Sequence, residues 1–251
     1  MIKMRSLQIC ILTCWLFACG KKEEKPAAIY DLKLIFENQV KGNALAIGDG
    51  YTNDFGEQYT VTAFKYYISN IELTTLSGQT EKINDTYFLI DQADKTTMLC
   101  AFKTKQQQYK AVSFLLGVDS TRNVSGVQTG ALDPAKGMFW TWNSGYIMAK
   151  LEATSRIAAT AGNRITYHIG GFKSGENAAR RITLNFGTLG NLNIGTTNTA
   201  AIFITTELNK WFSGQHNLKI ADQFEVMSPG GIAMKYADNY ERMFTVTAIR
   251  N

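Results

Sequence analysis

Apolar and polar residues alternate in short segments along most of the chain. Residues 30–36 place apolar side chains at every second position, the period of a half-buried strand, and residues 165–169 and 182–186 repeat this pattern. Further stretches rich in β-branched and aromatic residues predict strands at 59–73, 87–90, 111–116, 145–151, 201–205 and 244–249.

Helical signals are few and short. Residues 207–212 are expected to form one turn, and 232–243 a longer helix, because Ala233, Tyr236 and Tyr240 follow helical spacing. Many short strands separated by Gly, Asn, Asp and Thr indicate a sandwich or barrel-like domain. We therefore predict a mainly β fold over residues 29–251, a single antiparallel β-sandwich with one or two short helices.

The first eighteen residues have the pattern of an export leader. Lys3 and Arg5 precede an almost uncharged stretch at 7–17, which is too short to span a bilayer. Ala18-Cys19 resembles the end of the bacterial lipobox, so we expect residues 1–18 to be a lipoprotein signal peptide and Cys19 to be lipidated. The alternative is an ordinary cleaved signal peptide with an incidental cysteine.

Residues 19–28 are expected to form a lipid-anchored flexible tether, because they contain the charged run Lys-Lys-Glu-Glu-Lys and little to bury. This run also resembles the surface-export signal of Bacteroidetes lipoproteins, although a generic solvated linker would look the same. The expected location is the cell envelope, with the lipid in the outer membrane and the domain on its periplasmic or outer side.

Charge and cysteine content exclude some classes of protein. The 26 Lys and Arg residues include Lys3 and Arg5 of the leader, which leaves 24 against 21 acidic residues. These 24 are scattered, so we expect no nucleic-acid partner. Cys10 and Cys14 lie in the leader and Cys19 carries the lipid, so Cys100 has no partner for an internal disulfide.

Residues 117–152 combine a long polar, glycine-rich stretch with two tryptophans and a following strand. Such a stretch in a compact domain is typical of a functional or packed irregular loop. Together with other blocks, it resembles the MbnP-like family, and the resemblance covers most of residues 30–251. The matching blocks are YTN at 51–53 with Gly56 and Val61, KYYISNI at 65–71, GVD at 117–119, GALDP at 130–134, MFWTWNSGY at 138–146 and YHIGG at 167–171.

The resemblance implies a β-sandwich and a link to copper. In studied members a tryptophan can be oxidised to kynurenine by a di-haem partner enzyme related to MauG, and the modified residue takes part in metal binding. Trp140 and Trp142 lie in the matching block and are the candidates for modification or for a binding surface. The alternative is that they share one strand face and pack the domain, with indole N–H groups bonded to the preceding loop.

His168 and His216 are the candidate copper ligands. His168 lies on the strand face opposite its apolar neighbours, and His216 lies in a predicted turn. Imidazole and sulfur ligands both suit copper, but a shared site needs the fold to bring the two segments together. The alternative for His168 is a hydrogen bond to a neighbouring loop. The candidate sulfur ligands are Met138, Met148, Met227, Met234 and Cys100.

Asp119, Asn123, Asp133 and Asn143 supply oxygen atoms around the long loop. Calcium suits such groups, but their spacing fits no EF-hand, so hydrogen bonds that brace the loop are the expected role of Asp119, Asp133 and Asn143. Motifs of hydrolases, metalloproteases and phosphate-binding loops are absent from the sequence, so we expect the protein to have no enzymatic activity.

Two functions remain as hypotheses. The first is an envelope lipoprotein that binds copper and whose partners include a di-haem MauG-like peroxidase or an outer-membrane transporter. The alternative is a cell-surface ligand- or partner-binding module without metal, and a structural part of an envelope complex is a third option.

Overall fold

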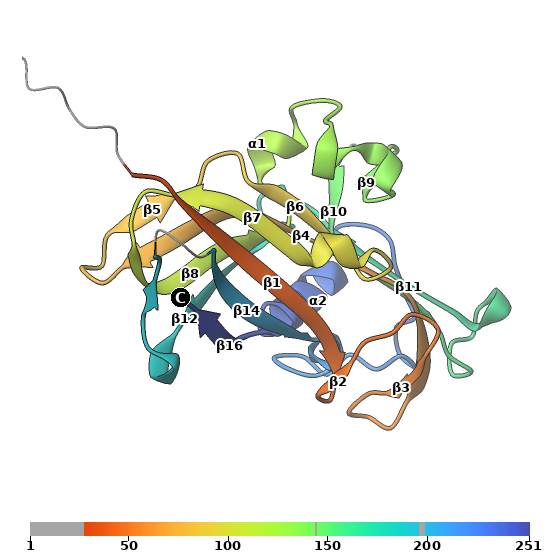
Figure 1. The fold of residues 1–251 in the computed structure, drawn as a ribbon. Coiled ribbons are helices and arrows are strands. Elements are labelled where there is room, and N and C mark those ends of the chain that lie inside the picture. Colours follow the sequence, from red (N-terminus) through yellow and green to blue (C-terminus); the bar gives the residue numbers. More distant parts are fainter. Residues whose placement is uncertain (1–27, 144, 196–198) are drawn as a thin grey trace, which may run out of the picture.

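The structure, a computed structural model, describes residues 28–143, 145–195 and 199–251. The predicted leader, Cys19 and all but the last residue of the predicted tether lie outside this part of the chain. Within it, two β-sheets pack face to face (Figure 1). The prediction of a mainly β sandwich is confirmed.

The smaller sheet contains the first and last long strands, in the order β16–β14–β1–β2, and β7 pairs with the first part of β1 along the same edge as β2. Its strands are β1 (Tyr30–Val40), β2 (Asn43–Ala44), β7 (Leu99–Thr104), β14 (Ala200–Glu207) and β16 (Phe244–Arg250). We did not predict β7, because its outward positions include Leu99 and Ala101 and the alternation in sequence is weak.

The larger sheet is built around the 18-residue strand β4, and its main order is β12–β8–β4–β10–β11–β15. Its long strands are β4 (Gln58–Thr75), β6 (Tyr87–Asp91), β8 (Gln108–Leu116), β10 (Gly145–Thr154), β11 (Arg164–Gly170) and β12 (Arg180–Asn185). Its short strands are β3 (Gly50–Thr52), β5 (Thr80–Lys82), β9 (Phe139–Trp140), β13 (Leu192–Asn193) and β15 (Glu225–Val226).

Two strand pairs depart from the antiparallel pattern that we predicted. β1 pairs with β14 in parallel, and β11 pairs with β15 in parallel. Alternation of side chains does not reveal strand direction, because it is the same in both arrangements. Both pairs join segments far apart in sequence, so no hairpin turn imposes an antiparallel direction.

The core between the sheets is aromatic. Phe36 and Phe244 of the smaller sheet meet Tyr66 and Phe114 of the larger one, with ring centroids 5.2 to 6.1 Å apart. The buried Tyr66 hydroxyl also donates to Asn38 Oδ1 on β1 at 2.8 Å. Burial of such rings supplies about 1.5–3 kcal/mol each, which holds the two sheets in register.

The helical segments are short and lie in the connections between strands. The α-helices are α1 (Ser120–Asn123) and α2 (Gly231–Tyr240), and the 3-10 turns are η1 (Lys95–Met98), η2 (Gly130–Leu132), η3 (Pro134–Lys136), η4 (Ala161–Asn163), η5 (Gly187–Leu189) and η6 (Leu208–Trp211). The predicted turn at 207–212 and helix at 232–243 correspond to η6 and α2. No helix among the described residues has both the length and the apolar character needed to cross a membrane.

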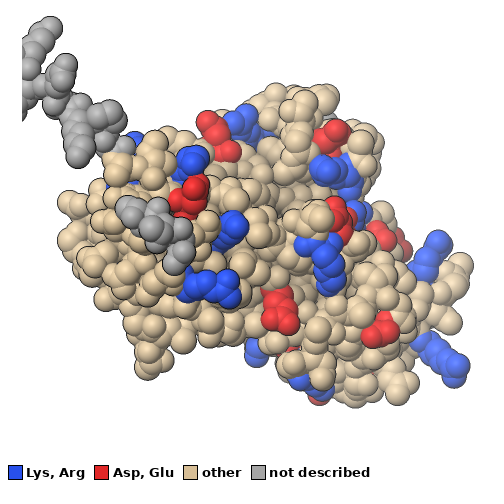
Figure 2. Space-filling view, viewed as in Figure 1, with Lys and Arg blue, Asp and Glu red and all other residues tan. Residues whose placement is uncertain are grey.

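The long polar stretch after β8 forms a separate projection. α1, η2, η3 and β9 lie in it, above the end of β10 in Figure 1. Basic and acidic side chains are interspersed over the face shown in Figure 2, without a large area of one sign. The projection and the strands beneath it position the candidate site.

Candidate functional site

His168 lies on β11 opposite Lys150 of β10. Its neighbours Tyr167 and Ile169 point into the core, so the alternation of the strand turns His168 to the other face, as its position in the sequence predicts. That face is covered here, because His168 is only 9 % exposed. A buried imidazole needs a polar partner.

The partner of His168 is a carboxylate on the neighbouring strand. His168 Nε2 lies 2.7 Å from Glu152 Oε1, and Lys150 Nζ lies 3.6 Å from the same oxygen. The hydrogen bond to His168 and the charge of Lys150 outweigh partial burial and hold the pKa of Glu152 below its ordinary value. Burial lowers the pKa of the Lys150 ammonium. The alternative interpretation of His168 was a hydrogen bond to a neighbouring loop. The partner of His168 is instead Glu152 on strand β10.

Trp140 packs over Gly170, on the face of β11 that also carries His168. Its ring covers Gly170, where an added Cβ would lie 2.6 Å from Trp140 Cζ3 and 2.8 Å from the carbonyl oxygen of Tyr146. Gly170 is two residues after His168, so their Cα atoms are about 7 Å apart and their side-chain positions share one face. The fold thus places the family-block tryptophan next to the candidate histidine.

Trp142 lies at the surface against Trp140. The ring centroids are 5.6 Å apart with an interplanar angle of 40°, yet Trp142 is 64 % exposed and Trp140 only 4 %. β9 ends at Trp140, so the two residues do not share the face of one strand as the packing alternative required. Trp140 Nε1 is buried and has no hydrogen-bond partner among the described residues, again unlike that alternative.

A pocket of about 140 Å³ opens beside the two tryptophans. Phe172 and Pro229 add to its apolar wall, and the polar groups around it come from the long loop, the turn after β11 and the segment after β15. The lining residues are Trp140, Trp142, Asn143, Gly145, Gly171, Phe172, Lys173, Glu176, Ser228 and Pro229. This arrangement can hold a small ligand against an aromatic surface.

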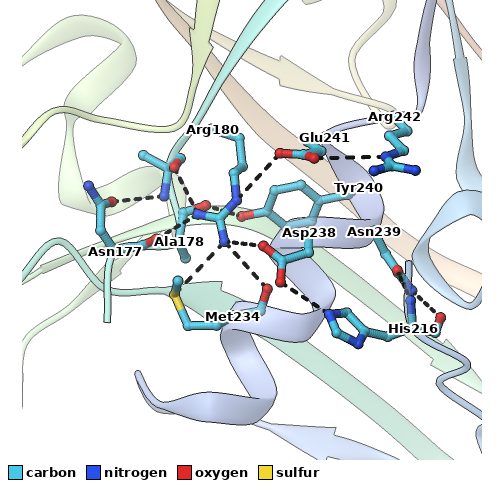
Figure 3. Close-up of polar contacts among 11 residues, drawn as sticks. Asn177, Ala178, Arg180, His216, Met234, Asp238, Asn239, Tyr240, Glu241 and Arg242 are labelled. Atoms are coloured by element: carbon cyan, nitrogen blue, oxygen red, sulfur yellow. Dashed lines mark hydrogen bonds and ion pairs between the residues drawn. The ribbon is translucent and has the colours of Figure 1, made fainter. Parts of the chain in front are cut away.

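His216 belongs to a second polar cluster, shown in Figure 3. Its Nε2 lies 3.1 Å from Asp238 Oδ2, and Arg180 Nη2 donates to the other oxygen of Asp238 at 2.7 Å. Burial favours the neutral form of Asp238, but Arg180 and His216 outweigh it and lower the pKa of Asp238. Asn239 holds the turn by accepting from the His216 N–H and donating to its carbonyl oxygen, both at 2.8 Å.

Comparison with known proteins agrees with this architecture. The MbnP family model matches residues 30–232, which is most of the chain. The chain belongs to the MbnP family. The solved structure of MbnP from Methylosinus trichosporium is similar with a TM-score of 0.50 and 14 % identity, over 76 % of this chain and 80 % of that one. At this identity the likeness supports the fold. No curated protein matches.

The two histidines of this MbnP-family chain do not share a partner. His168 contacts Glu152 on β10, whereas His216 contacts Asp238 on α2. Nowhere in the described residues do three His, Cys, Asp or Glu side chains group closely enough to hold a metal ion.

The candidate sulfur ligands are spread over the domain. Met138, Met148 and Cys100 are fully buried in the core. Met234 Sδ lies 4.0 Å from Arg180 Nη2, within the cluster around His216 (Figure 3), and Met227 is partly exposed. None of the described contacts joins a sulfur atom to His168.

Asp119 connects the base of the long loop to the neighbouring strands. Its Oδ2 accepts from Tyr87 at 2.6 Å and from Asn70 at 3.0 Å, and its Oδ1 accepts from the Arg122 N–H at 3.0 Å. Burial raises the pKa of Asp119, but these hydrogen bonds outweigh it, so the pKa lies below its ordinary 3.8.

Three other polar residues of the loop have separate surroundings. Asn123 donates to the carbonyl oxygens of Val118 and Asp119 and accepts from the Tyr146 N–H at 2.8 Å. Asp133 begins η3 by accepting from the Ala135 N–H at 2.9 Å, and Asn143 lines the pocket. Loop-bracing hydrogen bonds were the expected role of these polar residues; Asn123 and Asp133 make such bonds within the loop, whereas Asn143 faces the pocket.

The Asp119→Asn variant is expected to lose about 1–2 kcal/mol of unfolding free energy at neutral pH, because the amide accepts these three bonds less well. A lowered folded-state pKa means that the carboxylate stabilises above its ordinary pKa and that this stabilisation is lost as the pH falls through the folded-state pKa. Urea unfolding at a series of pH values from about 5 down to about 2.5 should therefore show that the difference in unfolding free energy between wild type and variant becomes smaller. Asp222→Asn, at an exposed position, is the control. A difference in unfolding free energy between Asp119→Asn and wild type that does not change with pH contradicts the assigned role of the Asp119 carboxylate.

Glu152 and Gly170 are site residues that sequence reasoning missed. A glutamate on a strand has no distinctive signal, and its contact with His168 depends on the register of β10 against β11. Gly170 does carry a signal, because a glycine within a strand often marks close approach of another group. Here that group is the Trp140 ring.

Proposed function

We propose that this MbnP-family chain is an envelope lipoprotein, anchored through Cys19, that binds copper with His168 as a ligand and has no enzymatic activity. The observation that carries the proposal is the pairing of His168 Nε2 with Glu152 beside the buried Trp140. Metal-binding histidines usually place their second ring nitrogen on a carboxylate, which fixes the ring and raises the basicity of the ligand atom.

Copper suits the groups near this imidazole. Nitrogen and soft ligands favour copper, and a Trp140 oxidised to kynurenine by a di-haem peroxidase of the MauG type would supply a further ligand. An outer-membrane transporter is the other partner that suits an envelope copper protein. His216 has the same carboxylate-paired geometry and is the second candidate ligand, in reach only with a rearrangement or in a site of its own.

The His168→Ala variant is expected to lose most of the copper that wild-type protein retains, about one equivalent per chain, because it removes the ligand itself. Glu152→Gln keeps the imidazole but loses the carboxylate, and we expect an affinity about 10–100-fold weaker. Both are measured by elemental analysis and by competition with a chromophoric copper chelator after gel filtration.

His216→Ala serves as the matched histidine control. It shows whether the two histidines belong to one shared copper site or to two separate sites. Wild-type protein that retains far less than one equivalent, or a His168→Ala variant that retains as much as wild type, contradicts the proposed ligand. Intact mass before and after exposure to a di-haem peroxidase tests the conversion of tryptophan.

A second function is favoured by the pocket at Trp142. A cell-surface module that binds a ligand without metal needs an exposed aromatic surface with polar groups around it, and the pocket has both. In this case Trp142 contacts the ligand directly, and binding continues in the presence of a metal chelator.

A further inference from the structure

The pocket beside Trp140 and Trp142 has the size of one small ring. Its volume is about 140 Å³. A cavity of about 150 Å³ accommodates a molecule of the size of benzene, whereas sites for drug-sized ligands begin at about 300 Å³. The pocket therefore takes a single ring or one terminal unit of a longer ligand.

The wall of the pocket offers a flat apolar surface that is held in place from beneath. Trp142 leaves most of its ring in solvent while resting on Trp140, and Trp140 is fixed by its close contact with Gly170. An exposed ring of this area is costly in water and gains free energy when a ligand covers it. A ligand with one apolar face fits this wall.

The polar groups around the opening carry no net charge. Lys173 and Glu176 come from one turn, closed by the Glu176 N–H donating to the Lys173 carbonyl oxygen at 3.0 Å, and Asn143 and Ser228 are neutral. A cationic ligand would meet Lys173 and an anionic one would meet Glu176. A neutral ligand with several hydroxyl groups can use an ammonium donor, a carboxylate acceptor and an amide together.

We infer that this pocket binds a neutral sugar unit, with the C–H face of a pyranose ring on Trp142 and its hydroxyl groups on Asn143, Lys173 and Glu176. A purely aromatic ligand would use the Trp142 ring but none of the polar groups around the opening. The inference rests on the second function proposed above and names its ligand class.

The test uses the full protein in the presence of a metal chelator, with glucose, galactose, mannose and N-acetylglucosamine as probes. Ligand-observed NMR and tryptophan fluorescence measure binding. The protein is expected to bind at least one of these one-ring sugars with a Kd on the order of 1 mM. The Trp142→Ala variant is expected to bind at least about tenfold more weakly, the loss that follows from removing about 1.4 kcal/mol of contact.

Val127→Ala, another exposed apolar side chain of the same projection, is the control and should bind as wild type does. Choline and glucuronate are tested beside the neutral sugars. If choline or glucuronate binds through Trp142 and the neutral sugars do not, the sugar inference is overturned while the metal-free ligand function stands. If none of the probes gives a signal that depends on Trp142, both are overturned. Neither outcome affects the copper proposal, because the chelator is present throughout.

Discussion

The Gly170→Ala variant is expected to lose about 3 kcal/mol of unfolding free energy, because the new methyl group would overlap both the Trp140 ring and the Tyr146 carbonyl oxygen. The ring is in a buried position and the carbonyl is backbone, so neither can move aside without cost. Urea unfolding gives the free energy. A red shift of tryptophan emission in the folded variant would report that Trp140 has become exposed to water.

Gly231→Ala is the matched control for this substitution. An added Cβ at Gly231 meets nothing within 4 Å, and alanine suits the first turn of α2. We expect that control to be neutral or slightly more stable than wild type. If Gly170→Ala is as stable as Gly231→Ala and keeps the wild-type emission, Trp140 does not pack on β11 as described. The same variant should bind copper more weakly, because it displaces Trp140 from beside His168.

The Glu57→Ala variant is expected to lose about 3 kcal/mol or more, because it removes the buried acceptor for three donors. Glu57 is 7 % exposed, and its carboxylate accepts from the N–H groups of Ile220 and Ala221 at 2.8 and 3.0 Å and from Asn53 Nδ2 at 2.6 Å. The bonds to Ile220 and Ala221 join the residue before β4 to a segment more than 160 residues later. Hydrogen bonds to a charged group contribute about 1.5–3 kcal/mol each. Among the described residues, Glu57 is the acceptor for both backbone N–H groups, so the variant leaves them without a partner.

Two variants serve as matched controls: one keeps part of the hydrogen bonding of Glu57, and the other changes an exposed glutamate elsewhere. Glu57→Gln retains one acceptor oxygen and should lose less than Glu57→Ala. Glu37→Ala, on an exposed position of β1, should change the unfolding free energy by less than about 0.5 kcal/mol. Thermal and urea unfolding of the three variants give the order, and equal stabilities for Glu57→Ala and Glu37→Ala would contradict the assigned role.

The copper and sugar proposals draw on adjacent parts of one surface. His168 and Glu152 lie on β11 and β10, Trp140 packs over Gly170 at the end of β11, and the pocket opens beside Trp140. Substitutions of His168 and Trp142 therefore separate the two activities, because each residue contacts only one of the proposed ligands. Gly170→Ala, by contrast, should disturb both.

Most of the strands and the fold class followed from local patterns. Alternation of side chains depends on the two-residue period of a strand, which is a property of each segment, so residues 30–36 and 165–169 could be assigned without knowledge of their neighbours. The same two-residue alternation correctly predicted that His168 lies on the strand face opposite Tyr167 and Ile169. The family resemblance rested on six blocks between residues 51 and 171, among them the block around Trp140, and the family model matches residues 30–232.

The sequence by itself thus determined most of the long strands, the family, and the histidines and tryptophans that are candidates for the site. Only the tertiary structure decided their pairing: the parallel strand pair β1–β14, the Glu152 partner of His168, the separate cluster of His216 and the exposure of Trp142 beside a buried Trp140. The physical reason is that a partner across a sheet depends on register and on strand order. These are set by contacts between distant segments, and no local pattern encodes them.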